Sequence, residues 1–290
     1  MRKQPQRIRF QIPDGPVLYG DRWAGTGGAM IVLLHGGGQT RRSWVREAAS
    51  LHEAGYSVLT YDARGHGESD WVADGDYSVS ALADDLLHIL SALPRPIALV
   101  GASMGGMTSF QALGASDRNI ADALVLVDIV PRIAKKGGQR ITRFMTAHLN
   151  GFATLEEAVE GVAAYNPNRA TPLDSSNLMH NLRLREDGRL YWHWDPRILD
   201  GRSTADVPSM NDGMLDLASN ITIPTMLVRG GASDIVDDTG VEELRRLLPQ
   251  MVIHTVASAS HMVAGDDNST FHAGIFPFLQ KHLPSARTEK

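Results

Sequence analysis

Short apolar runs alternate along this chain with longer segments in which apolar residues recur at helical spacing. The runs 30–34 and 97–100 contain no polar side chain, which is typical of strands buried on both faces of a parallel sheet. Segment 78–93 has a helical pattern and is followed by Pro94 and Pro96, so we expect a helix that ends there. The alternation indicates an α/β fold, with a mostly parallel central sheet flanked by helices.

The same patterns extend this prediction over most of the chain. The expected strands are 8–12, 17–23, 30–34, 57–61, 97–100, 123–127, 225–229 and 251–256. The expected helices are 43–54, 78–93, 105–115, 154–165, 239–248 and 269–283. The first two strands are joined at 13–16 (Pro-Asp-Gly-Pro), which is a turn signal.

The alternation stops between about residue 132 and residue 220, where helical stretches occur without a buried-strand run. This region also holds an aromatic cluster at 191–194 (Tyr-Trp-His-Trp). Because the alternation then resumes, we interpret the break as an inserted helical cap, or lid. The predicted domains are a core formed by 1–131 and 221–290, and a cap formed by 132–220.

Composition narrows the class of protein. The 290 residues are 43% hydrophobic and 21% charged, which suits one large α/β domain or a core domain with an insertion. The net charge of −5 argues against a nucleic-acid partner. The absence of cysteine excludes disulfides, thiolate catalysis and cysteine-ligated zinc.

The chain also lacks signals for a cofactor or a membrane. No cluster of His, Asp and Glu has metal-ligand spacing, so we expect no metal and no other cofactor. No stretch of about 18 apolar residues predicts a transmembrane helix, and residues 1–10 carry charges rather than the apolar run of a signal peptide. We expect a cytoplasmic monomer or homodimer whose partner is a small-molecule substrate.

The candidate chemistry centres on Ser103. This residue stands in the pentapeptide 101–105 (Gly-Ala-Ser-Met-Gly), between an apolar run and a helical pattern. Such a pattern is typical of a nucleophile elbow, in which a sharp strand-to-helix turn exposes the serine hydroxyl. The flanking glycines meet the need for minimal side chains where the turn brings backbone segments together. A serine needs a base and an acid to become a nucleophile, and Asp234 and His261 follow in that order.

Ligands of open α/β sheets bind beyond the carboxyl ends of the strands. Several motifs fall at such ends or in the last loop: 35–38 (His-Gly-Gly-Gly), 62–69 (Asp-Ala-Arg-Gly-His-Gly-Glu-Ser), 101–106 (Gly-Ala-Ser-Met-Gly-Gly), 230–234 (Gly-Gly-Ala-Ser-Asp) and 259–263 (Ala-Ser-His-Met-Val). With these motifs in this order, the chain resembles the α/β-hydrolase superfamily, in its esterase, haloperoxidase-like and epoxide-hydrolase-like branch. The resemblance covers nearly the whole chain except the cap.

The resemblance implies a catalytic triad. Ser103 would attack an acyl carbon, and His261 would remove the serine proton and later deliver it to the leaving group. Asp234 would hold the imidazole and stabilise its cation. Asp128, which follows the strand 123–127, is a second candidate for the acid, although this location is rarer in the superfamily.

The resemblance also implies an oxyanion hole beside the serine. The backbone N–H of Met104 would be one donor, and the 35–38 loop would supply the other. We expect that second donor to be Gly37, with Gly38 as the neighbouring alternative. His35 and His66 lie in loops that the family uses to brace the site.

We expect His35 and the cap residues Met145, Trp192 and Trp194 to line the substrate pocket. Apolar cap residues suit two interpretations, the ordinary core of the cap or an adaptable roof over Ser103 that favours hydrophobic acyl or alcohol groups. The methionines and tryptophans in question are Met145, Met179, Met210, Met214, Trp192 and Trp194.

The sequence therefore predicts a serine hydrolase that cleaves carboxylic esters, including lactones or polyesters, through an acyl-enzyme. Carbon–carbon bond hydrolysis and haloperoxidase-like perhydrolysis use the same triad and are the alternatives. A non-catalytic binding protein of the same fold is a further alternative, although such relatives often lose a triad member. An epoxide hydrolase or haloalkane dehalogenase would need a carboxylate at position 103, where this chain has serine.

Overall fold

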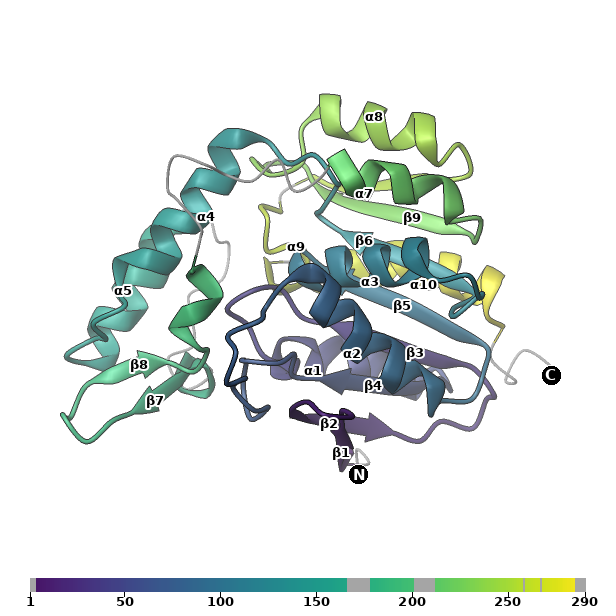
Figure 1. The fold of residues 1–290 in the computed structure, drawn as a ribbon. Helices are drawn as coiled ribbons and strands as arrows, with labels where there is room; N and C mark the ends of the chain where they lie inside the picture. Colours follow the sequence, from purple (N-terminus) through teal and green to yellow (C-terminus); the bar gives the residue numbers. More distant parts are fainter. Residues whose placement is uncertain (1–3, 166–177, 201–211, 258, 267, 285–290) are drawn as a thin grey trace.

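The computed structural model describes residues 4–165, 178–200, 212–257, 259–266 and 268–284. An eight-stranded sheet in the order β1-β2-β4-β3-β5-β6-β9-β10 forms its centre (Figure 1). The strands are β1 (Gln6–Gln11), β2 (Val17–Trp23), β3 (Met30–Leu34), β4 (Ser57–Tyr61), β5 (Ile97–Ala102), β6 (Ala123–Val127), β9 (Thr225–Gly230) and β10 (Val252–Val256). The pairs β1–β2 and β2–β4 are antiparallel, and the other pairs of this sheet are parallel. The carboxyl ends of β3, β5, β6 and β9 therefore meet at one edge, where a site is expected.

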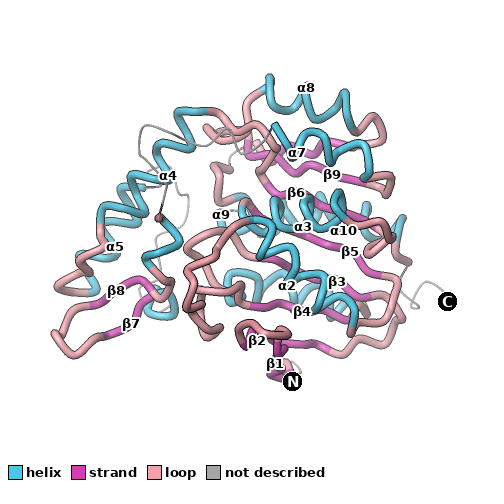
Figure 2. Tube along the Cα trace, in the orientation of Figure 1, coloured by secondary structure: helices cyan, strands magenta, loops and turns pink. Residues whose placement is uncertain are grey.

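Helices cover both faces of this sheet (Figure 2). They are η1 (Arg41–Trp44), α1 (Val45–Glu53), α2 (Val79–Ser91), α3 (Met104–Ala115), α8 (Asp238–Leu247), α9 (Val263–Asp266) and α10 (Asn268–His282). Helices α1 and α10 share one hydrophobic cluster with the sheet, and α2, α3 and α8 share the other. In β3, Val32 and Leu34 belong to one cluster and Ile31 and Leu33 to the other, so both faces of the strand are buried as its apolar run predicts.

Capping side chains mark where two of these helices begin. The Ser78 hydroxyl accepts a hydrogen bond from the Ala81 N–H at the start of α2 (3.2 Å). The Asp237 carboxylate accepts one from the Gly240 N–H at the start of α8 (2.8 Å). Each bond satisfies an amide that the helix itself leaves without a partner. Among the described helices, none combines the length and hydrophobicity needed to cross a membrane.

The segment between β6 and β9 departs from the sheet. Its described elements are α4 (Lys135–Ala147), α5 (Leu155–Tyr165), η2 (Met179–Asn181), β7 (Leu182–Leu184), β8 (Leu190–Trp192), η3 (Pro196–Leu199), α7 (Asp212–Leu217) and η4 (Ala218–Asn220). Figure 1 shows α4, α5 and the β7–β8 pair beside the sheet, outside its two helical layers. We call the described residues 135–165 and 178–200 the cap. We expected a helical cap, but the cap also contains two strands, β7 and β8, which form an antiparallel pair.

The cap has a hydrophobic core of its own. Phe152 is fully buried and meets the ring of Trp192 edge to face, with 5.1 Å between ring centroids. The cluster also includes Met145, Trp194 and, from the core domain, Tyr77. The cap therefore packs as a small unit and shares this cluster with one loop of the sheet domain.

Helix α7 lies with the sheet domain rather than with the cap. A Cβ atom added at Gly114 of α3 would lie 2.6 Å from the Cβ atom of Leu217, so glycine permits this close helix–helix contact. Met214 is buried in the main hydrophobic cluster of the sheet. Met214 is thus not part of a roof over the serine, and Met210 lies outside the described residues.

Candidate active site

Ser103 lies at the turn between β5 and α3, where strand ends and helix begins without an intervening loop. Its backbone angles are φ 46° and ψ −113°, a left-handed conformation that costs roughly 1–3 kcal/mol for a residue with a side chain. Serine at a helix N-cap usually bonds to the first turn, but Ser103 makes no such side-chain bond. The backbone of Ser103 is therefore strained, and its hydroxyl has no hydrogen-bond partner among the described residues.

Neighbouring glycines make this turn sterically feasible. A Cβ atom at Gly101 would lie 2.4 Å from the carbonyl oxygen of Gly105, and one at Gly105 would lie 2.5 Å from that of Leu34. Both distances are far inside van der Waals contact, so larger residues would push the turn open. The sequence prediction that the elbow requires minimal flanking side chains agrees with this packing.

His261 is held by Asp128. The imidazole Nδ1 lies 2.8 Å from Oδ2 of Asp128, a carboxylate that is fully buried at the end of β6. The same carboxylate accepts hydrogen bonds from the N–H of Gly230 (2.8 Å) and the hydroxyl of Ser233 (2.5 Å). Because a carboxylate only accepts, Nδ1 carries the proton and Nε2 is left as a base.

Asp234 does not hold the imidazole, which corrects the sequence expectation. Its two oxygens accept hydrogen bonds from Nε (2.7 Å) and Nη2 (2.6 Å) of Arg140 in α4. The start of α4 also packs directly on this loop, since a Cβ atom at Gly137 would lie 2.1 Å from the Asp234 carbonyl oxygen. The loop thus directs Ser233 inward to Asp128 and turns Asp234 toward the cap, so Asp234 is an anchor between core and cap.

The glycine loop after β3 lies against the elbow. A Cβ atom at Gly36 would lie 3.5 Å from the Cβ of Ser103, and one at Gly37 would lie 3.9 Å from the Cβ of Met104. The Gly36 N–H donates to Oε1 of Gln39 (3.1 Å).

The amides of this loop differ in their hydrogen bonds. The Gly38 N–H donates to Nε2 of His66 (3.2 Å). The Gly37 N–H has no partner in the described part of the chain. The Met104 N–H, at the first position of α3, is one of the amides that a helix leaves unbonded. The geometry therefore favours the N–H groups of Gly37 and Met104 as the candidate oxyanion donors. The Gly38 N–H is less suited, because it already donates to His66.

His35 supports this loop instead of lining a pocket, so that expectation is corrected. Its side chain is buried at 2% exposure. Nδ1 lies 2.8 Å from the Gly36 carbonyl oxygen, and Nε2 accepts a hydrogen bond from the Ala63 N–H (3.0 Å). Burial lowers the pKa of His35, in agreement with a neutral ring that donates through one nitrogen and accepts through the other.

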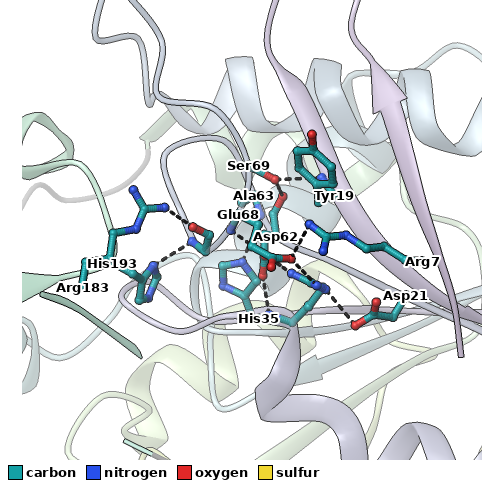
Figure 3. Close-up of polar contacts among 12 residues, drawn as sticks. Arg7, Tyr19, Asp21, His35, Asp62, Ala63, Glu68, Ser69, Arg183 and His193 are labelled. Carbon is teal, nitrogen blue, oxygen red and sulfur yellow. Dashed lines mark hydrogen bonds and ion pairs between the residues drawn. The ribbon is translucent and has the colours of Figure 1, made fainter. Parts of the chain in front are cut away.

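The 62–69 motif forms a rigid base beneath these histidines. The Asp62 carboxylate is fully buried and accepts hydrogen bonds from the Arg41 amide (2.7 Å), the Arg41 guanidinium and the Glu68 amide (3.0 Å). Figure 3 shows Asp62 at the centre of a polar network that extends to Arg7 and Asp21. A buried carboxylate bound in this way fixes the loop that carries His66.

Two of the predicted cap residues reach the glycine loop. Measured from a Cβ atom built on Gly38, the nearest atoms are Nε1 of Trp194 (3.7 Å) and Cε of Met145 (3.9 Å). Trp192, Trp194 and Met145 all belong to the hydrophobic cluster of the cap, and Met179 is 40% exposed. Trp194 and Met145 thus join the cap core to the glycine loop, and a roof over Ser103 stays a prediction.

Sequence reasoning missed His193, which stands between the two tryptophans of the aromatic cluster. It is buried, and its imidazole bonds to the glycine loop. Its position inside an apolar cluster was the available signal, because a buried histidine needs hydrogen-bond partners.

The fold, the strained serine and the Asp128–His261 pair at one sheet edge are features expected of an α/β hydrolase. Comparison with known families agrees, since residues 29–267 match the model of the alpha/beta hydrolase fold family. The chain therefore belongs to the α/β hydrolase fold family and is an enzyme of that family.

Named relatives and solved structures extend this result. An esterase from Mycobacterium tuberculosis (Esterase Rv0045c) is 30% identical over 252 residues, covering 84% of this chain and 80% of the relative. A mouse protein named sn-1-specific diacylglycerol lipase ABHD11 is 30% identical over 268 residues, covering 86% of this chain and 80% of the relative. The crystal structure of the mycobacterial esterase superposes with a TM-score of 0.73 at 26% identity, covering 96% and 93% of the two chains. The structure of E-2-(acetamidomethylene)succinate hydrolase has a TM-score of 0.80 at 20% identity, covering 95% and 99%, and shows the shared fold.

Proposed function

We propose that this protein is a serine hydrolase that cleaves carboxylic esters through an acyl-enzyme, with Ser103 as nucleophile, His261 as base and Asp128 as the acid. The observation that carries this proposal is the hydrogen bond between His261 Nδ1 and the buried Asp128. It leaves the opposite ring nitrogen as a base at the sheet edge where the strained serine stands. The named esterase and lipase relatives support the same reaction class.

The sheet order supports the approach of His261 to Ser103. Strand β5, which ends at the serine, lies between β3 and β6. His261 bonds to Asp128 after β6, and the sulfur of the next residue, Met262, accepts a hydrogen bond from Gln39 after β3 (3.3 Å). The dipeptide 261–262 thus bridges from one side of β5 to the other, across the strand end that carries Ser103.

The reaction follows from these positions. The imidazole Nε2 takes the Ser103 proton as the hydroxyl oxygen attacks the ester carbonyl carbon, and the carbonyl π electrons move to the oxygen. The N–H groups of Gly37 and Met104 stabilise that oxyanion. Collapse of the tetrahedral intermediate breaks the bond to the alcohol, which receives the proton from His261. Water then repeats the sequence on the acyl-enzyme and releases the acid, while Asp128 stays ionised and stabilises the imidazolium.

The surroundings of the loop support a class of substrate. The methyl carbon Cε of Met145 lies near the Cβ position of Gly38, beside the indole Nε1 of Trp194, and methionine adapts to varied apolar shapes. We therefore propose small or hydrophobic esters as substrates, with lactones and polyesters in the same chemical class.

Active-site labelling tests the proposal. A fluorophosphonate probe should label the wild-type chain, and peptide mapping should locate the label on Ser103. Ser103→Ala should abolish labelling and lower kcat for p-nitrophenyl esters by roughly 10³- to 10⁶-fold, whereas Ser80→Ala on the exposed side of α2 should change neither.

A substrate panel then separates the reaction classes. It should contain p-nitrophenyl acetate, butyrate and octanoate, a lactone and a vinylogous diketone. Preference for the diketone would assign carbon–carbon bond hydrolysis. Absence of both labelling and turnover would contradict a serine hydrolase and favour a binding protein.

A further inference from the structure

Three imidazoles surround the glycine loop 35–39. His35 and His66 come from the core domain, and His193 comes from the cap, directly after β8. The ring centroids of His35 and His66 are 5.1 Å apart, and those of His66 and His193 are 5.9 Å apart. The three rings therefore form one cluster in which core and cap meet at the loop.

Each imidazole holds a different peptide unit of the loop. Nδ1 of His35 bonds to the Gly36 carbonyl oxygen (2.8 Å), and Nε2 of His66 accepts from the Gly38 N–H (3.2 Å). Nε2 of His193 lies 3.2 Å from the Gly38 carbonyl oxygen. Since a peptide unit is planar, these contacts orient the three successive units that join residues 36 to 39. The first of these units carries the Gly37 N–H, the candidate oxyanion donor.

The contacts of His193 also define its tautomer. Nδ1 accepts a hydrogen bond from the Gly67 N–H (2.7 Å), so this nitrogen has a lone pair and the ring proton lies on Nε2. Nε2 therefore donates to the Gly38 carbonyl oxygen. Burial and, secondarily, His35 lower the pKa of His193 to about 3, in agreement with a neutral ring. The charged groups that face it are Asp62 and Arg183.

The cap binds both backbone polar groups of Gly67. The guanidinium of Arg183 in β7 donates to the Gly67 carbonyl oxygen, while His193 accepts from the Gly67 N–H. Figure 3 shows Arg183 and His193 side by side, facing the loop that contains Asp62, Ala63 and Glu68. The imidazole thus spans from a rigid loop of the core to the glycine loop.

The glycine loop needs such support. Gly38 has φ +75°, and consecutive glycines have many accessible backbone conformations. An oxyanion donor contributes most when it is already oriented before the reaction, since reorientation then costs nothing during catalysis. We propose that His193 is a positioning residue, supplied by the cap, that holds the glycine loop in the conformation required of the oxyanion hole. This proposal rests on the serine hydrolase function proposed above.

The test compares substitutions at position 193 that separate hydrogen bonding from packing. His193→Phe keeps a ring and removes both hydrogen bonds. His193→Gln removes the ring but keeps one acceptor and one donor. His193→Ala removes both, and His180→Ala, at an exposed cap histidine, is the matched control. Circular dichroism and thermal unfolding check the fold of each variant.

We expect the substitutions to lower kcat and to leave KM nearly unchanged. For p-nitrophenyl butyrate, His193→Phe and His193→Ala should lower kcat by roughly 10- to 100-fold with KM within about 3-fold, less than the loss on deleting an oxyanion donor. The inhibition constant of a trifluoromethyl ketone, which forms a tetrahedral oxyanion on the serine, should rise in parallel with the fall in kcat/KM. His193→Gln should recover most of the activity, and His180→Ala should match the wild type.

Three outcomes would overturn the proposal. They are wild-type kcat in His193→Phe, equal losses in the Phe and Gln variants, or a change in KM alone. If His193→Ala does not fold, the comparison of kcat between His193→Phe and His193→Gln still tests the proposal. A wild-type chain that is neither labelled at Ser103 nor active would instead reject the proposed function, whereas a labelled His193→Phe variant with wild-type kcat would reject this inference alone.

Discussion

At the scale of single residues, Asp128 and Asp234 are the two candidates for the acid that bonds to His261, and they differ in burial. Asp128 is fully buried and receives a serine hydroxyl, a backbone N–H and the His261 ring. Asp234 is part-exposed, and both of its oxygens bind Arg140. Only the first arrangement places a carboxylate where it can stabilise an imidazolium in a low-dielectric setting.

Substitution of each aspartate distinguishes these roles. Asp128→Asn should lower kcat by roughly 10³- to 10⁴-fold, because the amide favours the wrong imidazole tautomer and offers no charge to the cation. Asp234→Asn should change kcat by less than about 10-fold, since it weakens only the bond between the loop and α4. Steady-state hydrolysis of p-nitrophenyl butyrate measures both effects, and the opposite ranking would return the acid to position 234.

Glycines in the site loops give a second prediction at this scale. A Cβ atom at Gly67 would lie 2.2 Å from Oδ2 of the buried Asp62, and its φ is +56°. Gly67→Ala should therefore lower the free energy of unfolding by roughly 2–4 kcal/mol. Gly28→Ala is the control, because nothing lies within 4 Å of its Cβ position, and it should change stability by less than about 1 kcal/mol. Urea denaturation of the two variants measures the difference, and similar losses would contradict the steric argument.

The choice of acid shows where sequence reasoning reached its limit. The motifs predicted the strained turn at Ser103 and the glycine loop beside it, because each depends on a local backbone requirement; the role of His261 as base stays a prediction. Asp128 and Asp234 both follow strands whose carboxyl ends meet at the same edge. Which one turns inward depends on the Ser233 and Gly230 contacts, which are long-range and have no local pattern.

At the scale of elements, continuous apolar runs predicted strand bounds well, since β3 and β6 agree with the expected strands at 30–34 and 123–127. The bounds of β2 and β4, whose segments include polar residues, also agree with the expected 17–23 and 57–61. Strands β7 and β8 were missed because each has three residues, and β7 is exposed at two of them. Such short strands are stabilised by the partner strand and by the core of the cap, so their own sequence has little alternation of apolar and polar residues to reveal them.

The contact between α1 and α10 gives a pH-dependent prediction. Nδ1 of His272 in α10 lies 2.8 Å from the buried Glu47 carboxylate in α1, and this hydrogen bond raises the pKa of His272. A raised folded-state pKa stabilises the protein fully below the unfolded-state pKa, and this contribution is lost as pH rises through the folded-state pKa. His272→Gln should therefore cost more stability at pH 5.5 than at pH 9.

Urea denaturation of wild type and variant at both pH values gives this difference, because other titrating groups largely cancel. Glu47→Gln should remove the same pH dependence, since it removes the charge that favours the imidazolium. A stability gap independent of pH would mean that the pair acts through packing alone.

At the scale of the whole molecule, the cap is bound to the core at points that surround the site. Arg140 binds Asp234, His193 accepts from the Gly67 N–H, and Arg183 donates to the Gly67 carbonyl oxygen. The cap also reaches the glycine loop through Trp194. Because these contacts converge on loops that carry or brace the candidate chemistry, we expect the position of the cap and the geometry of the proposed oxyanion hole to be coupled.

A further attachment of the cap follows directly after Trp194, and it allows this coupling to be tested with a substitution that removes no hydrogen bond to the glycine loop. The buried Asp195 carboxylate accepts hydrogen bonds from the Tyr77 hydroxyl (2.5 Å) and from Arg197 (2.6 Å). Arg197 in turn donates to the carbonyl oxygens of Val72 (2.8 Å) and Ala73 (3.0 Å) in the core. Asp195→Ala leaves Tyr77 and Arg197 without this partner, at a cost of roughly 1–3 kcal/mol.

Because that cost falls on the attachment of the cap, the cap should open locally while the sheet keeps its stability. Hydrogen exchange in Asp195→Ala should accelerate over 182–192 and remain unchanged over 97–115, and kcat should fall with it. Asp187→Ala is the control, since Asp187 bonds within the cap to Arg189 and Tyr191 and its loss should leave both exchange in the glycine loop and kcat unchanged. Faster exchange of the cap in Asp195→Ala with wild-type kcat would show that the oxyanion loop keeps its geometry without the cap, and the coupling would then be rejected.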